Sequence, residues 1–322
     1  DLITATCSFS RYDNPDLRSA GELVLMNPTG GGIALVTTVR LVYASGNYDL
    51  NRNLLTQLFI KIDGQYPALG DAVKKGKNAV TTGATNNRKF ILLGDPALVL
   101  NYPKFNVATK TVNGFDVAIY TDTLKALDKV VITGEVTDEA GLKLSSFNGT
   151  VYPAVYDKPI TINNLVNDPT FSGVGGYGPS QPFSFELQKN ALYKGKASVT
   201  NGEFQFTFIV PKDISYSYGA GKLSYYADNG LEDANGYNSN VIIGGTADNA
   251  PTDAAGPLVD VYMNDETFVF GGLTDENPVL LIKLVDSSGI NALGNAVGHD
   301  ITATLDDDQQ TTLKLNEYYE SD

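Results

Sequence analysis

The hydrophobic pattern of this chain changes near residue 105, and the change sets the fold class expected on each side. Before it, short apolar runs such as 33–38 stand between segments of helical spacing, which is typical of buried parallel strands alternating with helices. After it, segments such as 129–141 and 221–230 alternate apolar and polar residues between turns rich in Gly and Asn. We therefore expect an α/β domain over 1–105 and β-sandwich structure beyond it.

Charge divides at the same place. Residues 1–105 carry 11 Lys and Arg against 8 Asp and Glu, whereas 106–322 carry 12 against 29, which gives the net charge of −14. The acidic excess of the second part argues against nucleic acid as a partner, because phosphates would be repelled. A linker-like stretch at 246–257 separates two expected immunoglobulin-like sandwich domains, 106–246 and 247–322, and the second is short, as a truncated domain would be.

Local signals place several elements. Residues 2–7 and 33–38 are predicted to be parallel strands joined by a helix that begins at Asn14 and Pro15, a cap residue and a first-turn proline. Further elements are predicted at 50–60 and 67–78 (helices), 89–96 (a strand) and Asn201-Gly202 (a hairpin turn).

The single cysteine, Cys7, ends the first apolar run. It is either a small buried hydrophobe or a nucleophile, and its place at the carboxyl end of a predicted parallel strand is where α/β folds bind ligands. A thiol nucleophile needs a base, usually histidine. The only histidine, His299, lies in a β-rich segment far along the chain and is expected to be a polar surface residue. From these residues alone, Cys7 has no identified base.

Several separated motifs carry a family resemblance: "ITATCSFSRYDNP", "SAGELVLMN", "GGGIALVTTVRLVYASGNYDLN" and "NNRKFILLGDPALVLNYP". Together they resemble the carboxyl-terminal half of the peptidase domain in the gingipain family of cysteine peptidases. The segments "GKASVTNGEFQFTFIVPKDI" and "VGHDITA" resemble the region that follows that domain. The resemblance implies a caspase-like α/β fold, here a partial parallel sheet with helices, and a Cys–His dyad.

The resemblance also implies roles for single residues. Cys7 takes the place of the nucleophile, and the dyad histidine belongs to a His-Gly motif on a preceding strand, which does not occur before Cys7. We therefore expect the catalytic histidine to lie outside this chain and the chain alone to be inactive. Arg40 and Tyr43, in "TTVRLVY", are candidate substrate-binding residues, with a surface ion pair as the alternative for Arg40. Glu22 is expected to be a helix-face charge.

The function implied is that of a cysteine endopeptidase or transpeptidase, a sortase that removes carboxyl-terminal sorting signals from secreted proteins and attaches them at the cell surface. The implied partners are those secreted substrates and other components of the type IX secretion system, and the implied location is the extracellular face of the outer membrane. An open edge of a partial sheet would also allow pairing with the missing amino-terminal part or with another chain.

Two alternatives remain open. One is a non-catalytic cell-surface protein whose β-sandwiches bind a partner or act as a scaffold. The other is a Ca²⁺-dependent adhesin, because 228–236 and 306–310 are rich in acidic residues that could hold structural Ca²⁺. Neither segment has EF-hand spacing, so solvated turns are the simpler interpretation, and the family resemblance requires no cofactor.

Overall fold

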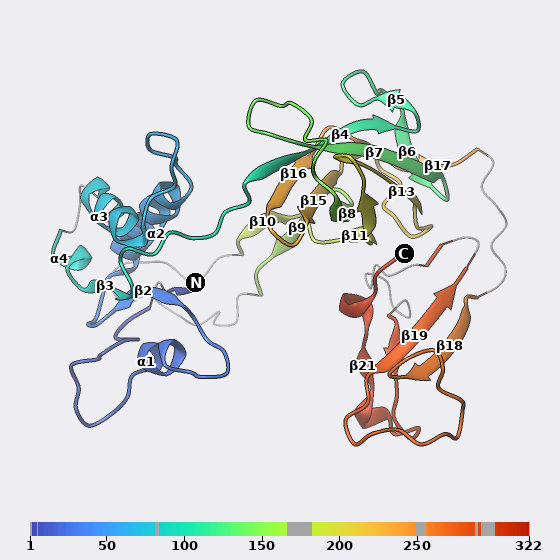
Figure 1. The fold of residues 1–322 in the computed structure, drawn as a ribbon. Helices are drawn as coiled ribbons and strands as arrows, with labels where there is room; N and C mark the ends of the chain where they lie inside the picture. Colours follow the sequence, from blue (N-terminus) through green and yellow to red (C-terminus); the bar gives the residue numbers. More distant parts are fainter. Residues whose placement is uncertain are drawn as a thin grey trace. The chain divides into compact units, whose positions relative to one another are not determined.

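The computed structural model has a mixed α/β fold in which strands predominate (Figure 1). It divides into two compact units, Asp1–Tyr102 and Pro103–Asp322, called unit 1 and unit 2 below. Among the described residues, no helix combines the length and apolar character needed to cross a membrane. The structure describes residues 2–4, 6–80, 84–165, 182–248, 256–286, 289–290 and 300–321.

Unit 1 is a three-stranded sheet with helices. Its elements are β1 (Leu2–Ile3), α1 (Ala20–Leu25), β2 (Ala34–Thr38), α2 (Ala44–Leu58), α3 (Leu69–Ala79), α4 (Ala84–Asn87) and β3 (Phe90–Gly94). The strand order is β1-β2-β3, and β1 pairs in parallel with β2, as the sequence predicts. However, β3 runs antiparallel to β2, because α2 to α4 return the chain to the end of the sheet where β2 finishes. The sheet is therefore only partly parallel.

The core of unit 1 forms where α2 and α3 pack against the sheet. All five residues of β2 are buried, as expected for a strand covered on both faces. Leu50, Leu54 and Leu58 recur every fourth residue and bury one face of α2. A Cβ on Gly76 of α3 would stand only 3.0 Å from Leu54 Cα, so glycine allows the two helices to approach closely.

The first helix begins later than predicted. Asn14 does not cap it, because the Asn14 side chain accepts a hydrogen bond from Asp16 N (3.0 Å) in a local turn. Instead α1 starts at Ala20, where Ser19 N and Ser19 Oγ donate to Glu22 Oε2 at 2.8 and 2.6 Å. The capping box of Ser19 and Glu22 therefore sets the start of α1, in place of the predicted start at Asn14.

Unit 2 is built almost wholly of strands. Its elements are β4 (Phe105–Val112), β5 (Phe115–Asp116), β6 (Thr123–Ala126), β7 (Lys129–Thr137), β8 (Gly149–Tyr156), β9 (Ile160–Asn163), β10 (Ser184–Leu187), β11 (Ala191–Lys194), β12 (Ala197–Val199), β13 (Glu203–Ile209), β14 (Gly219–Ala220), β15 (Lys222–Asp228), β16 (Asp233–Asn238), β17 (Ile242–Thr246), β18 (Leu258–Met263), β19 (Leu280–Val285), β20 (Thr302–Ala303), β21 (Leu313–Lys314) and two short 3₁₀ helices, Gln309–Thr311 and Asn316–Tyr318.

A nine-stranded sheet carries the core of unit 2. Its strand order is β11-β8-β15-β16-β4-β7-β13, with β12 on β8 and β5 on β4, and a smaller sheet has the order β14-β17-β6. Alternate residues point inward, such as Phe204, Phe206 and Phe208 of β13. The predicted hairpin turn is present between β12 and β13, where Asn201 and Gly202 have φ of 52° and 76°. These left-handed conformations suit Asn and Gly, which is why this pair marks the turn in the sequence.

One ion pair is buried in unit 2. Lys158 Nζ donates to Asp157 Oδ1 (2.6 Å), Ser215 O (2.9 Å) and Ile243 O (3.3 Å). Both side chains are nearly enclosed, at 10% exposed for Lys158 and 7% for Asp157. The ammonium thus has an acceptor for each of its three protons and joins the end of β8 to β17 and to the segment before β14.

The described residues beyond β17 form two small antiparallel pairs, β18 with β19 and β20 with β21. They belong to unit 2. The domain boundaries predicted from sequence and the immunoglobulin-like form of the sandwiches remain predictions.

Candidate active site

Cys7 lies just beyond the carboxyl end of β1, with an exposed side chain. The parallel pairing continues past the strand, because Thr4 N donates to Val36 O at 3.0 Å. The Cys7 thiol lies 3.6 Å from Val42 O, to which it donates a weak hydrogen bond. The thiol is therefore accessible rather than buried, and it stands at the edge of the sheet where α/β folds bind ligands.

Hydroxyl groups fix the turn that carries Cys7 onto β2. Thr37 Oγ1, fully buried, accepts hydrogen bonds from Thr4 Oγ1 (2.8 Å) and Ser10 Oγ (3.3 Å). Thr38 Oγ1 donates to Thr6 O at 2.5 Å, and Ser10 N donates to Thr38 O at 2.9 Å. The chain is thus held on both sides of Cys7. These hydroxyl groups were not predicted from the sequence, in which their one signal is a Thr-Thr pair that ends an otherwise apolar strand.

Arg40 is paired with a carboxylate. Its guanidinium donates Nη1 to Asp13 Oδ1 (3.1 Å) and Nη2 to Asp13 Oδ2, and Nη1 also donates to Val39 O (2.8 Å). The hydrogen bonds from Arg40 hold the pKa of Asp13 below its usual value, and Asp13 raises the pKa of Arg40. This is the surface ion pair considered as an alternative from sequence. A role in substrate binding remains a prediction.

Tyr43 presents an exposed ring from a fixed backbone. It precedes α2, and its N–H donates to Asn86 Oδ1 at 2.9 Å. Asn86 Nδ2 in turn donates to Asn47 Oδ1 at 3.3 Å. Lys89 Nζ stands 5.2 Å from the centre of the Tyr43 ring and donates to Leu41 O at 2.7 Å. The ring is thus exposed on a fixed backbone, and its role in substrate binding remains a prediction.

The structure brings Cys7 together with the segment that contains Arg40 and Tyr43. Beside the contact of the thiol with Val42 O, Ser8 N donates to Arg40 O at 3.3 Å. Glu22 is engaged in the α1 capping box, where its hydrogen bonds with Ser19 lower its pKa. His299 lies outside the described residues.

The alternative of a structural Ca²⁺ site gains no support within the described part of the chain. There, no three side chains of His, Cys, Asp or Glu converge as they would around a metal ion. The acidic segments 228–236 and 306–310 lie in this part of the chain.

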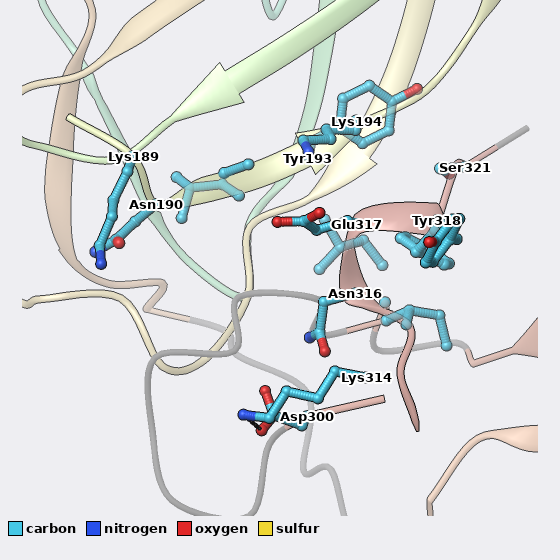
Figure 2. Close-up of a pocket in the computed structure, with 16 residues that line it drawn as sticks. Lys189, Asn190, Tyr193, Lys194, Asp300, Lys314, Asn316, Glu317, Tyr318 and Ser321 are labelled. Atoms are coloured by element: carbon cyan, nitrogen blue, oxygen red, sulfur yellow. Dashed lines mark ion pairs between the residues drawn. The ribbon is translucent and has the colours of Figure 1, made fainter. Parts of the chain in front are cut away.

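A cavity of about 520 Å³ lies in unit 2, beside β11 and the segment that ends at Ser321 (Figure 2). Ser321 N donates to Lys194 O at 2.9 Å, so this segment adds to the exposed edge of β11. An ion pair between Lys314 and Asp300, 2.5 Å apart, occupies one side of the cavity, and Glu317 another. The lining does not include any residue of the candidate active site, which belongs to unit 1.

Comparison with known proteins finds a peptidase family to which unit 1 is similar. The model of peptidase family C25 matches residues 2–101, which confirms the resemblance to the gingipains. No curated protein matches the chain.

Solved structures of this group are also similar to the chain. Dimeric latent PorU from Porphyromonas gingivalis is 28% identical over 90% of this chain, with a TM-score of 0.46. The complex of the RgpB pro- and mature domains from Porphyromonas gingivalis is 11% identical over 73% of this chain and 46% of its own, with a TM-score of 0.28. The Arg-specific cysteine proteinase gingipain R is 11% identical over 73% of this chain and 45% of its own, with a TM-score of 0.26. The chain spans 27% of the PorU chain.

Proposed function

We propose, from the match of residues 2–101 to peptidase family C25, that this chain is the nucleophile-bearing part of a gingipain-type cysteine peptidase. The match supports the class of reaction. The exposed thiol of Cys7 at the carboxyl end of β1 supports the choice of nucleophile, since it is the only thiol in the chain. Its hydrogen bond to Val42 O orients the sulfur beside the segment 40–43.

In the proposed reaction, the Cys7 thiolate attacks the carbonyl carbon of the scissile peptide bond. The C–N bond then breaks, the leaving amine takes a proton from the base, and the acyl group stays on sulfur as a thioester. Water or an amine attacks the thioester, which releases a carboxylic acid or a new amide and returns the thiol. The base is a histidine in the family dyad. We place it outside this chain, so that the chain alone does not turn over.

The finer assignment is that of a sortase at the cell surface, on the extracellular face of the outer membrane. Its substrates would be secreted proteins with carboxyl-terminal sorting signals, and its partners would be other components of the type IX secretion system. An amine that resolves the thioester would make the reaction a transpeptidation and attach the product at the surface. The sequence motifs shared with the gingipain family over residues 1–105 and in the strands that follow support this proposal. Unit 2 would then supply the immunoglobulin-like sandwiches, 106–246 and 247–322.

Arg40 and Tyr43 would line the specificity pocket of this peptidase. Tyr43 offers an exposed ring on a hydrogen-bonded backbone. Arg40 would have to exchange its Asp13 partner for a substrate carboxylate or carbonyl, which costs little because the pair is half exposed.

The test uses the full-length protein in cells that secrete cargo. Cys7→Ala is expected to abolish cleavage of the sorting signal, so that uncleaved cargo accumulates, whereas the control Thr6→Ala, an exposed neighbour, retains cleavage. Unimpaired processing in the Cys7→Ala cells would overturn the nucleophile assignment and favour the non-catalytic scaffold. Tyr43→Ala and Arg40→Gln are expected to change the rate order among cargo proteins with different cleavage sites.

A further inference from the structure

The outer face of the nine-stranded sheet in unit 2 carries three exposed tyrosines on adjacent strands. Tyr152 of β8 lies directly opposite Tyr226 of β15, and their rings stack with centres 6.2 Å apart. Tyr237 of β16 is 73% exposed, and Tyr152 and Tyr226 are 40% and 44% exposed. A stacked cross-strand pair of this kind stabilises the sheet, and the exposed faces and edges of such rings can contact a ligand. We call these three residues the tyrosine face.

Small and polar side chains lie beside the rings. On β15, Ser224 lies two residues before Tyr226 on the same face, and it pairs with Ala154 of β8 and with Tyr237 of β16. Because Tyr226 pairs with Asn235, Tyr226 and Tyr237 are diagonal neighbours with Ser224 and Asn235 beside them. A shallow hollow of about 650 Å³ opens beside Tyr237, and Ser224, Asn106 and Asn235 also line it.

The charges around the hollow are already engaged. Lys222, the one charged residue in its lining, holds its Nζ 4.7 Å from the centre of the Tyr156 ring. Asp233 accepts a hydrogen bond from Tyr226 Oη at 3.4 Å. Residues 106–322 as a whole are strongly acidic, so an anionic ligand would meet a repulsive field.

We propose that the tyrosine face binds a neutral oligosaccharide. A sugar ring has apolar C–H faces and a rim of hydroxyl groups, which matches aromatic rings beside neutral hydrogen-bonding groups. Tyr226 and Tyr237 stack against the C–H faces, and the Ser224 hydroxyl and the Asn235 amide bond to the sugar hydroxyls. A protein contact is less well matched, because the centre of such an interface is apolar, whereas Ser224 and Asn235 lie between these two rings.

This inference is independent of the proposed peptidase reaction, because it concerns unit 2 and its readout is binding. The full chain is run in native gels that contain soluble β-glucan, α-mannan or xylan, with polygalacturonate as the anionic comparison. We expect at least one neutral polysaccharide to retard the protein. Tyr226→Ala and Tyr237→Ala should each weaken that binding roughly fivefold or more. Tyr226→Phe, which keeps the ring, should stay within about threefold of the original affinity.

Two controls separate binding from folding. Each variant is compared with the original chain by far-ultraviolet circular dichroism and thermal unfolding, and an alanine variant with altered spectra is replaced by its serine counterpart. Tyr48→Ala removes an equally exposed tyrosine from α2 of unit 1 and should leave retardation unchanged. Retardation by no neutral polysaccharide, or by polygalacturonate alone, would overturn the proposal. So would self-association of the chain that Tyr226→Ala abolishes, since it would assign the face to a protein contact.

Discussion

Replacing Lys158 by methionine tests the energetic role of the ion pair buried in unit 2. The change keeps most of the side-chain volume but removes the ammonium, so the Asp157 carboxylate is left in a nearly enclosed site without its counter-charge. Ser215 O and Ile243 O lose the same donor. Breaking a buried ion pair from one side costs about 3–5 kcal/mol, and we expect a loss of about 4 kcal/mol here because all three hydrogen bonds of Nζ disappear together.

The assay is hydrogen–deuterium exchange of peptides from β8 and β15, which reports the opening free energy of unit 2 separately from unit 1. The matched control is Lys143→Met, because Lys143 pairs with Glu203 on the surface, where the side chains are 38% and 63% exposed. That variant should be destabilised far less, because solvent screens the exposed pair. Adding Asp157→Asn to Lys158→Met should restore part of the loss, since the buried charge is then gone. Equal, small losses for the two lysine variants would refute the reasoning.

Three further predictions concern unit 1. Arg40→Gln should raise the pKa of Asp13 towards its ordinary value of 3.8, as measured by carboxyl ¹³C titration. Because this pKa is lowered in the folded state, the ion pair should stabilise unit 1 above pH 3.8 and should lose this effect as the pH falls through the folded-state pKa. An unchanged Asp13 titration in the variant would contradict this prediction. Thr37→Val should destabilise unit 1 by about 2 kcal/mol, because two buried hydroxyls lose their acceptor, and unchanged exchange protection of β2 would argue against it. Glu22→Ala should unwind α1 at neutral pH, as seen in the Cα chemical shifts of this helix. Because the hydrogen bonds with Ser19 lower the folded-state pKa of Glu22, the difference in these shifts between the variant and the original chain should shrink as the pH falls below 4.5. A shift difference that persists in acid would contradict the capping role.

Elements whose signal is local could be predicted closely. The strand expected over 33–38 is β2, because an apolar run that is buried on both faces is visible without knowledge of its neighbours. The Asn201-Gly202 turn is equally local, since both residues need left-handed backbone angles. The position of Cys7 at a sheet edge follows from the same kind of rule, as the end of one strand can be read from the sequence alone.

Competition between local signals caused the error in α1. Asn14 and Ser19 both precede plausible first turns, and only the folded chain shows that the Asn14 side chain is used within its own turn. A helix from Asn14 would also have taken in Leu17, which is 71% exposed. The sequence alone does not determine whether Asn14 or Ser19 caps the helix.

Features that depend on how distant segments pair could not be predicted from the sequence. Asp13, the partner of Arg40, lies 27 residues earlier in the chain, and Ser10 reaches Thr37 over the same separation. The reversed direction of β3 is of this kind too, since it depends on how three helices return the chain. Each requires the relative placement of elements that the sequence specifies only one at a time.

The pairing of β4 with β16 has a consequence for the order in which unit 2 can fold. β4 opens the unit, yet it pairs in parallel with β16, and Lys104 N donates to Asp233 O across a separation of 129 residues. Contacts of such long range close late, because the chain loses its loop entropy before the contact stabilises it. During synthesis from the amino terminus, this edge of β4 therefore stays unpaired until β16 has emerged. For that period it is an exposed strand edge to which a chaperone can bind.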